Sequence, residues 1–241
     1  MAECDYMAPE EAIQRTRWDG VMVERTEREV IVACKALTLE IEHVQSKLGS
    51  DIPVVWVDRG LHNFPVKLNA AVQEALDGLH DVDRVLLGYA NCGNAIKGAM
   101  ARDFEIIIPK VDDCISILFN SQKAREAYSA EYASMFMTEG WMDADHNIVQ
   151  EYYYMVDKYG EETAVSFTEM MYAHYRTMTY LDTGLYSIPD LMEQTKVICD
   201  IAELKTRTHP VELTYIEQLI GGPWPEDRFM HIAPGEVIPA F

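Results

Sequence analysis

The sequence predicts an α/β protein with a mostly parallel sheet, helices on both faces of the sheet and a helical insertion in the middle of the chain. Short, near-continuous apolar runs alternate with segments whose apolar residues recur at helical spacing. Such runs are typical of strands in a parallel sheet, because helices bury both faces of that sheet. From about residue 121 to 176 the chain instead becomes rich in Tyr, Met and Glu. We therefore expect one domain over residues 1–241, with a helical insertion at about 121–176.

The first part of the chain reads as two strand–helix units. The apolar run at residues 30–33 predicts a strand, and helical spacing predicts that a helix follows it, with apolar positions at Leu37, Ile41, Val44 and Leu48. The next run, IPVVWV, predicts a strand that ends near Asp58. A second helix is expected from Pro65, and its apolar stripe consists of Leu68, Val72, Ala75, Leu76 and Leu79.

Two more strands precede the insertion, and further elements follow it. DRVLLG predicts a third strand, and NCGNAIKGAMA predicts a loop and a helix after it. FEIIIP predicts a fourth strand that ends at Pro109. After the insertion, residues 177–181 predict a strand, IPDLMEQTKVICDIAEL a helix and RFMHIAP a last strand. We therefore expect the sheet to regain strands after the insertion.

Composition restricts the class of partner and the compartment. The chain has 40 acidic and 20 basic residues and a formal net charge of -20, which repels nucleic acids and anionic membranes. No apolar run at the amino terminus resembles a signal peptide, and no segment approaches the roughly 20 apolar residues of a membrane span, so we expect a cytoplasmic protein. Five cysteines, an odd number, favour a reducing compartment. The sequence leaves oligomerisation open.

Three cysteines and one histidine stand where a site is expected. Cys34, Cys92 and Cys114 each follow a separate predicted strand, and His62 follows another. Ligands of open α/β sheets bind outside the carboxyl ends of the strands, where loops from several strands converge. If these strands are neighbours, the four side chains lie near one crevice. Thiolates and imidazoles are ligands that zinc prefers, so the pattern predicts a zinc site.

The loop around the second of these cysteines suits a cofactor. A helix starting just after it would favour the thiolate, a glycine lets the backbone turn closely, and two amides offer hydrogen bonds. The expected cofactor-binding residues of this loop are Asn91, Gly93 and Asn94. Taken singly, each cysteine is also typical of a buried apolar position. Cys4 and Cys199 lack the placement at strand ends, and we interpret both as structural or incidental.

Acidic residues supply further candidates. Asp112 and Asp113 precede Cys114, where carboxylates orient an imidazole or a bound water. Asp182 ends a predicted strand and is a third catalytic candidate, although an aspartate there is also typical of a cap or turn. Glu139, in the motif EGW, is a further cofactor-binding candidate that would close a pocket, although a helix core of Tyr and Met explains its aromatic surroundings better. Neither Gly-x-Gly-x-x-Gly nor a Walker motif occurs, which disfavours a tightly held nucleotide.

Several segments together resemble the family called domain of unknown function 1638: ACKALTLEIEHV, DRGLHNFPVKLNAAVQEAL, LLGYANCGNAIKG, IPKVDDCISILF, TEGW, LDTGLY and GPW. The resemblance extends over nearly the whole chain, and its most specific parts are residues 88–94 and 111–116. It implies a setting in methanogens and other anaerobes, often beside corrinoid-dependent methyltransferases for methylamines. It implies no established reaction, so it assigns no catalytic residue.

We therefore expect a metal-binding cytoplasmic enzyme or enzyme accessory of anaerobic one-carbon metabolism, in which zinc holds a small-molecule thiolate that accepts a methyl group. Cys92, Cys114 and His62 would bind zinc, with Cys34 as fourth ligand or as the group that substrate displaces. An iron–sulfur cluster on the three cysteines is one alternative. A metal-free acidic protein that docks on a methyltransferase or corrinoid protein is another. A third is an enzyme that uses Cys92 or Cys114 as a nucleophile.

Overall fold

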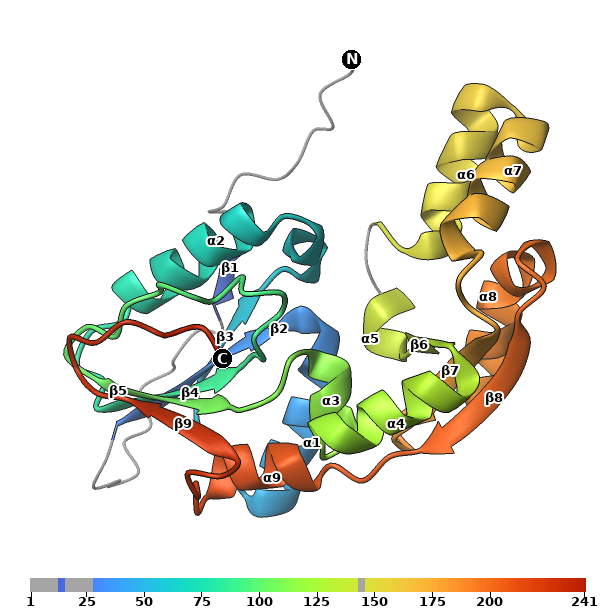
Figure 1. The fold of residues 1–241 in the computed structure, drawn as a ribbon. Helices are drawn as coiled ribbons and strands as arrows, with labels where there is room; N and C mark the ends of the chain where they lie inside the picture. Colours follow the sequence, from blue (N-terminus) through green and yellow to red (C-terminus); the bar gives the residue numbers. More distant parts are fainter. Residues whose placement is uncertain (1–12, 16–27, 143–145) are drawn as a thin grey trace. The chain divides into compact units, whose positions relative to one another are not determined.

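The computed structural model describes residues 13–15, 28–142 and 146–241. Contacts divide the chain into two compact units, one formed by Met1–Ile117 with Thr214–Phe241 and the other by Leu118–Leu213. Each unit contains its own sheet (Figure 1). No helix in the described part of the chain combines the length and apolar character that crossing a membrane requires.

The first unit contains a mostly parallel sheet. In the described residues this sheet has six strands in the order β1-β3-β2-β4-β5-β9, and the central four are mutually parallel, whereas both edge strands are antiparallel. Its elements are β1 (Ile13–Arg15), β2 (Glu29–Cys34), α1 (Thr38–Leu48), β3 (Val54–Val57), α2 (Pro65–Asp77), β4 (Arg84–Gly88), β5 (Glu105–Pro109), α9 (Thr214–Gly221) and β9 (Phe229–Ile232). Short 3-10 helices follow β2 (Lys35–Leu37) and β3 (Arg59–Asn63), and α3 (Cys114–Leu118) follows β5.

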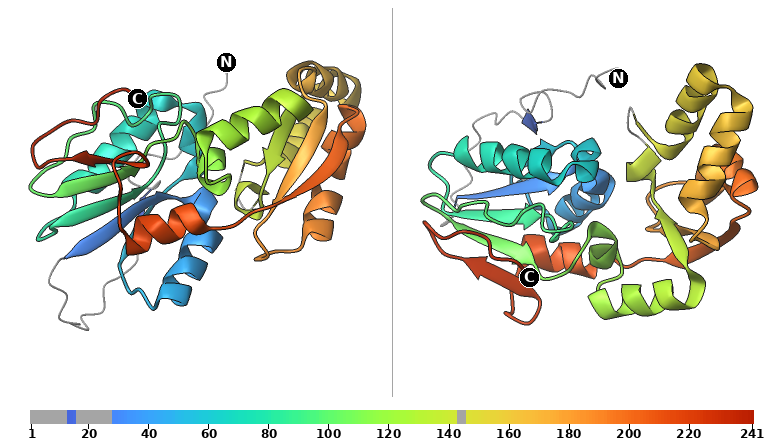
Figure 2. Two further views of the ribbon diagram at one scale, coloured as in Figure 1. Left: turned by 60° about the horizontal axis from the view of Figure 1, so that its bottom comes forward. Right: turned by 45° about the horizontal axis from the view of Figure 1, so that its top comes forward.

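Helices cover both faces of this sheet, as the near-continuous apolar strands predict. α2 covers one face, and α1 and α9 pack together on the other (Figures 1 and 2). All of β3 is buried, as is every residue but the first of β2, β4 and β5. Such strands are stable only between two helical layers. The predicted α/β class with a mostly parallel sheet is therefore confirmed.

Local sequence explains where the first helices begin and end. α1 ends at Gly49, whose φ of 62° closes the helix in the left-handed conformation that glycine adopts without a steric penalty. α2 begins with Pro65 at its first position, where the missing N–H is not needed. The apolar stripe predicted for α2 is buried at Leu68, Val72, Ala75 and Leu76.

The second unit contains the helical middle region and a three-stranded parallel sheet. Its elements are α4 (Gln122–Tyr132), β6 (Ser134–Met137), α5 (Glu139–Met142), α6 (Ile148–Tyr159), α7 (Glu161–Tyr172), β7 (Thr177–Asp182), α8 (Ile188–Ile201) and β8 (Lys205–Pro210). In the described residues its strands follow the order β6-β7-β8. The core includes Met137, Met178 and Tyr180 from the sheet and Leu191 and Ile198 from α8.

The helical middle region expected from the sequence is confirmed, and it also contains β6. The expectation that the strand at residues 177–181 rejoins the first sheet is wrong, because β7 pairs with β6 and β8, and among the described residues the first sheet regains only β9. The reason lies in the two different faces of β7. Met178 and Tyr180 face the core, whereas the hydroxyl groups of Thr177 and Thr179 bond to Ser134 Oγ at 2.6 and 2.9 Å. Both faces of β7 are buried, so the hydroxyl groups of its second face must be paired inside the unit, and Ser134 of β6 supplies that partner.

Candidate functional site

The carboxyl ends of β3, β2, β4 and β5 lie side by side at one edge of the first sheet. After β2 the chain moves outward to β3 and then returns to β4 on the other side of β2, so its winding direction reverses between β2 and β4. The helices on either side of β3 accordingly lie on opposite faces of the sheet (Figure 2). Ligands of such sheets bind at this reversal point. Cys34 ends β2, and Tyr89 immediately follows β4.

β2 and β4 approach each other closely at the carboxyl end of β4. A Cβ atom placed on Gly88, the last residue of β4, would lie 2.6 Å from Cβ of Ala33 and 3.3 Å from Cδ1 of Ile41. Only glycine fits so short a contact without displacing a neighbour. Gly88 therefore keeps the end of β4, and the loop behind it, against Cys34.

The three predicted thiol ligands lie near one another. Burial is the main cause that raises their pKa from 9.0, to about 11 for Cys34, to about 12 for Cys92 and well above 9.0 for Cys114. Charge repulsion adds to it, because Cys34 raises the pKa of Cys92, and both raise the pKa of Cys114. Cys92 retains some solvent exposure, although the surrounding protein desolvates its thiol. All three are free thiols and are protonated at neutral pH.

Tyr89 is a site residue that the sequence analysis missed. It is 2 % exposed, and burial followed by the charges of Cys34 and Cys92 raises the pKa of its hydroxyl. It therefore lies beside both thiols. The Tyr89 hydroxyl also interacts with the Cys34 thiol by a hydrogen bond, which lowers the pKa of Cys34 and further raises that of Tyr89. The sequence does not identify this tyrosine as a site residue, because nothing in the apolar run LLGYA distinguishes it from a core aromatic residue.

The backbone around Cys92 is unusual. Cys92, Gly93 and Asn94 have consecutive positive φ values of 48°, 67° and 67°. Residues other than glycine adopt this conformation at a cost of order 1–3 kcal/mol, and such positions cluster at functional sites. The Cys92 N–H donates to the carbonyl of Asp112 at 2.7 Å, and the Asn91 N–H donates to that of Val111 at 3.0 Å. The loops after β4 and β5 are thus joined beside the thiols.

The helix predicted after Cys92 does not form. Residues 92–98 make successive turns, because Gly93, Asn94 and Gly98 adopt positive φ and interrupt the helical pattern of AIKGAMA. The expected helix terminus is therefore absent beside Cys92, and the thiol pKa is raised instead of lowered. The expectation of a thiolate stabilised by a helix is wrong.

This long loop is nevertheless held on both sides. From α2, Asn69 Nδ2 donates to the carbonyls of Ala95 and Lys97 at 2.9 Å, and Gln73 Oε1 accepts from the Met100 N–H at 2.7 Å. From the other side, the carboxyl-terminal segment pairs with it through bonds such as Gly98 N–H to the Ile238 carbonyl at 2.8 Å. Loops of this length without secondary structure are uncommon in compact domains and usually functional.

The remaining residues of the two loops have defined structural partners or are exposed. Asn91 is buried, and its Nδ2 donates to the carbonyl of Phe241 at 2.7 Å. Asp113 Oδ1 accepts from the N–H and the hydroxyl of Ser116, both at 2.7 Å, so it caps α3. Charge repulsion from Asp113 also raises the pKa of Cys92 and Cys114. Asp112 is exposed.

The other sequence candidates are exposed, belong to the second unit or lie outside the described residues. His62 is exposed in the 3-10 helix after β3, and it contributes to none of the three thiol pKa shifts. Asp182 belongs to the second unit, where its Oδ1 accepts from the Gly184 N–H at 3.0 Å in a turn. Glu139 begins α5, also in the second unit. Cys199 is buried 3.6 Å from the Tyr180 hydroxyl, and Cys4 lies outside the described residues.

Glu40 is a second residue that the sequence analysis missed. It lies in the first turn of α1, is 1 % exposed, and neither carboxyl oxygen has a hydrogen-bond partner in the described part of the chain. Burial raises its pKa to about 7. Buried carboxyl groups are normally paired, so an unpaired one needs a functional or structural explanation. The sequence does contain an indication, because helical spacing places position 40 beside the apolar positions Leu37 and Val44.

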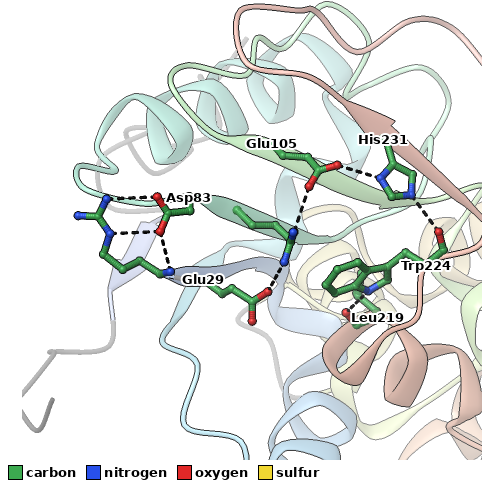
Figure 3. A network of polar contacts seen from close by, with 8 residues as sticks. Glu29, Asp83, Glu105, Leu219, Trp224 and His231 are labelled. Atoms are coloured by element: carbon green, nitrogen blue, oxygen red, sulfur yellow. Dashed lines mark hydrogen bonds and ion pairs between the residues drawn. The ribbon is translucent and has the colours of Figure 1, made fainter. Parts of the chain in front are cut away.

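A polar network lies at the opposite edge of the sheet, where the parallel strands begin (Figure 3). Arg84 Nη1 contacts Glu29 at 2.9 Å, and its Nε contacts Glu105 at 3.1 Å. His231 Nδ1 lies 2.9 Å from Glu105, and its Nε2 lies 2.9 Å from the carbonyl of Trp224. The guanidinium also stands over the Trp224 ring, at 4.6 Å from its centroid. The network connects β2, β4, β5 and β9, which suits a structural role.

Comparisons with known proteins identify the family but no activity. No curated protein and no solved structure matches the chain. A family model described as "Protein of unknown function (DUF1638)" matches residues 56–220. The matched residues include Cys92 and Cys114 and begin after Cys34. Because this match covers more than half of the 241-residue chain, the chain belongs to the DUF1638 family.

Proposed function

We propose that this protein binds a thiophilic metal ion, with Zn²⁺ as the first candidate, through Cys34, Cys92 and Cys114. One observation carries the proposal. Three thiols that end or follow β2, β4 and β5 lie near one another at the reversal point of a parallel sheet. A single buried cysteine is ordinary, but three from separate strands at a ligand-binding edge are not.

Electrostatics favours a cation over a free cysteine nucleophile. A nucleophilic cysteine needs a lowered thiol pKa, whereas burial and neighbouring thiols raise the pKa of all three. Asp58 raises the pKa of Cys34, and Asp113 raises that of the other two. A bound cation reverses this penalty, because thiolate ligands bind metal in exchange for their protons.

The three cysteines suit a zinc ion by the chemistry of their thiolates more than by their present positions. Thiolates are preferred zinc ligands, and three of them leave one coordination position open. Among the described residues, no three His, Cys, Asp or Glu side chains are gathered closely enough to form a metal centre. A bound ion would therefore draw the thiols closer together than they lie in this structure. His62 is exposed and is not part of the proposed site.

We further propose that the open position receives a small thiol, which is activated as a methyl acceptor in anaerobic one-carbon metabolism. The support for this step is the resemblance to a family associated with corrinoid-dependent methyltransferases, together with the ability of zinc to hold a thiolate nucleophile. A corrinoid protein or methyltransferase would then be the partner, and the chain would act as an enzyme or as its accessory.

Elemental analysis of the purified protein tests the metal proposal. Protein prepared without oxygen or chelator should contain about one zinc per chain. The variants Cys34→Ser, Cys92→Ser and Cys114→Ser should each lose most of it. Cys199→Ser is the matched control, since this buried cysteine lies in the other unit beside Tyr180, and it should retain the metal.

The outcomes separate the alternatives. If the protein contains iron and absorbs visible light, the same thiols hold an iron–sulfur cluster and not zinc. A wild-type protein that neither contains nor takes up zinc or iron would refute the metal proposal and favour a metal-free docking protein. Equal zinc loss in Cys199→Ser would show that the metal depends on general stability, so circular dichroism spectra of all variants accompany the analysis.

A further inference from the structure

The Tyr89 side chain leaves the first sheet on the same face as the Cys34 thiol. In the parallel pairing of β2 with β4, Ala33 is paired with Gly88, and the next residues along the chain are Cys34 and Tyr89. A Cβ atom on Gly88 would contact both Ala33 and Ile41 of α1, so the pair of Ala33 and Gly88 faces the α1 layer. Side chains alternate along a strand, so Cys34 and Tyr89 both face the opposite layer, which contains α2.

This geometry leaves the Tyr89 hydroxyl group with one hydrogen-bond acceptor. Tyr89 is 2 % exposed, and no oxygen or nitrogen atom of the described residues accepts a hydrogen bond from its hydroxyl. The acceptor is the Cys34 sulfur: burial raises the pKa of Cys34, and the hydrogen bond from Tyr89 opposes that rise. Sulfur in a neutral thiol is a weak acceptor. The buried hydroxyl is therefore poorly satisfied as long as Cys34 carries its proton.

The close approach of β2 and β4 keeps the hydroxyl group in this place. A side chain on Gly88 would lie 2.6 Å from Cβ of Ala33 and would push the two strands apart just before Cys34 and Tyr89. The donor is thus held rigidly beside the thiol, by packed strands and not by a loop. Such a fixed donor suits a group that must orient a metal ligand.

We propose that Tyr89 is a positioning residue of the metal site, and that its hydroxyl donates a hydrogen bond to the Cys34 thiolate when that thiolate binds the metal. This inference rests on the proposed metal function. Each cysteine releases its proton to solvent as the bond between its sulfur and Zn²⁺ forms, so the sulfur becomes a charged and stronger acceptor. Groups that hold metal ligands in this way typically raise the metal affinity by about 10- to 100-fold.

The zinc affinity of Tyr89→Phe tests the proposal, because this change removes the hydroxyl group and keeps the ring. Competition with a chromophoric chelator should give a dissociation constant about 10- to 100-fold higher than that of the wild type. Thermal unfolding of the metal-free variant should show it to be as stable as the metal-free wild type or more stable, since the lost hydroxyl had only a weak acceptor. A purely structural tyrosine would instead lose stability without metal.

The absorption spectrum of the Co²⁺-substituted protein supplies a second readout, which a loss of packing would not move in a fixed direction. A thiolate that loses a hydrogen bond holds its electrons less tightly. The sulfur-to-cobalt charge-transfer band of Tyr89→Phe should therefore lie at longer wavelength than that of the wild type. Tyr89→Leu, which also lacks the hydroxyl group, should shift the band in the same direction.

Tyr180→Phe is the matched control. Tyr180 is also fully buried on a strand near a cysteine, but it belongs to the second unit, and its hydroxyl oxygen lies 2.7 Å from Thr195 Oγ1 and 3.6 Å from the Cys199 sulfur. Because this hydroxyl group has an oxygen partner, its removal should lower the thermal stability. The zinc affinity and the cobalt band should stay as in the wild type.

The outcomes separate this inference from the proposed function. A wild type that binds neither zinc nor cobalt overturns both. If the wild type binds zinc, an equal affinity or an unshifted cobalt band in Tyr89→Phe overturns the role of Tyr89 alone. An equally large loss of affinity in Tyr180→Phe would also overturn it, because the effect would then follow the loss of any buried hydroxyl group.

Discussion

Replacing Glu40 by glutamine should stabilise the protein in a pH-dependent manner. The carboxyl group is 1 % exposed, and burial raises its pKa from 4.5 to about 7. An acid whose folded pKa is raised destabilises the native state above its unfolded pKa, because the native state disfavours ionisation. The penalty is therefore absent below pH 4.5, grows as pH rises, and is complete above about pH 7.

The magnitude follows from the two pKa values. The interval from 4.5 to about 7, at about 1.36 kcal/mol for each pH unit, corresponds to about 3 kcal/mol at pH 8. Glutamine has the shape of the protonated carboxyl group but never ionises. The free energies of unfolding of Glu40→Gln and wild type should therefore be similar at pH 4.5 and differ by about 3 kcal/mol at pH 8.

Urea denaturation at several pH values measures this difference. A Trp141→Phe background leaves Trp18, Trp56 and Trp224 as the fluorescent reporters, and all three fall within the residue ranges of the first unit, to which Glu40 also belongs. Glu42→Gln is the matched control, because Glu42 is exposed on the same helix. If the curves of Glu40→Gln and wild type run parallel from pH 4.5 to pH 8, Glu40 has a partner that neutralises its burial, and the reasoning is wrong.

Two further predictions concern the two edges of the first sheet. The hydrogen bond to Glu105 raises the pKa of His231 above 6.5, so their contact stabilises the fold below pH 6.5, and this stability is lost as pH rises through the raised value. His231→Asn should remove this pH-dependent loss of stability. For so exposed a pair the loss amounts to about 1 kcal/mol or less in the free energy of unfolding, and urea titrations at pH 6 and pH 9 measure it. Gly88→Ala should destabilise by about 1–3 kcal/mol, because the new methyl group would lie 2.6 Å from Cβ of Ala33. Gly221→Ala, whose nearest contact is 3.4 Å, is its control in thermal unfolding, and equal effects of both changes would contradict the steric explanation.

The fold class could be predicted because the central strands are buried on both faces and therefore read as continuous apolar runs. The separate second sheet could not be predicted in this way. Lys205–Pro210 contains no large apolar residue and is a strand only because it pairs with β7 at the exposed edge. The turns after Cys92 were missed because Ala95, Ile96 and Ala99 are buried at a spacing that also suits a helix.

The candidate site was only partly accessible from sequence. Strand ends identify which loops converge at one edge, but the order β3-β2-β4-β5, which makes these loops neighbours, depends on long-range packing. Residues without a chemical motif were missed for the same reason. Tyr89 becomes a candidate only once its burial beside the thiols is known. Glu40 becomes one only once its burial and the lack of hydrogen-bond partners for its carboxyl oxygens among the described residues are known.

The division of the first unit between the two ends of the sequence affects its synthesis on the ribosome. β5 pairs with β9 from Ile106 to Pro109, yet β9 is translated only after the whole second unit. The nascent sheet therefore leaves the exit tunnel with an apolar edge strand that lacks its final partner. Such an edge is prone to pair with other chains. A stall or truncation between these strands should thus produce chaperone-bound or aggregated fragments, whereas chains that reach Ile232 can complete the edge.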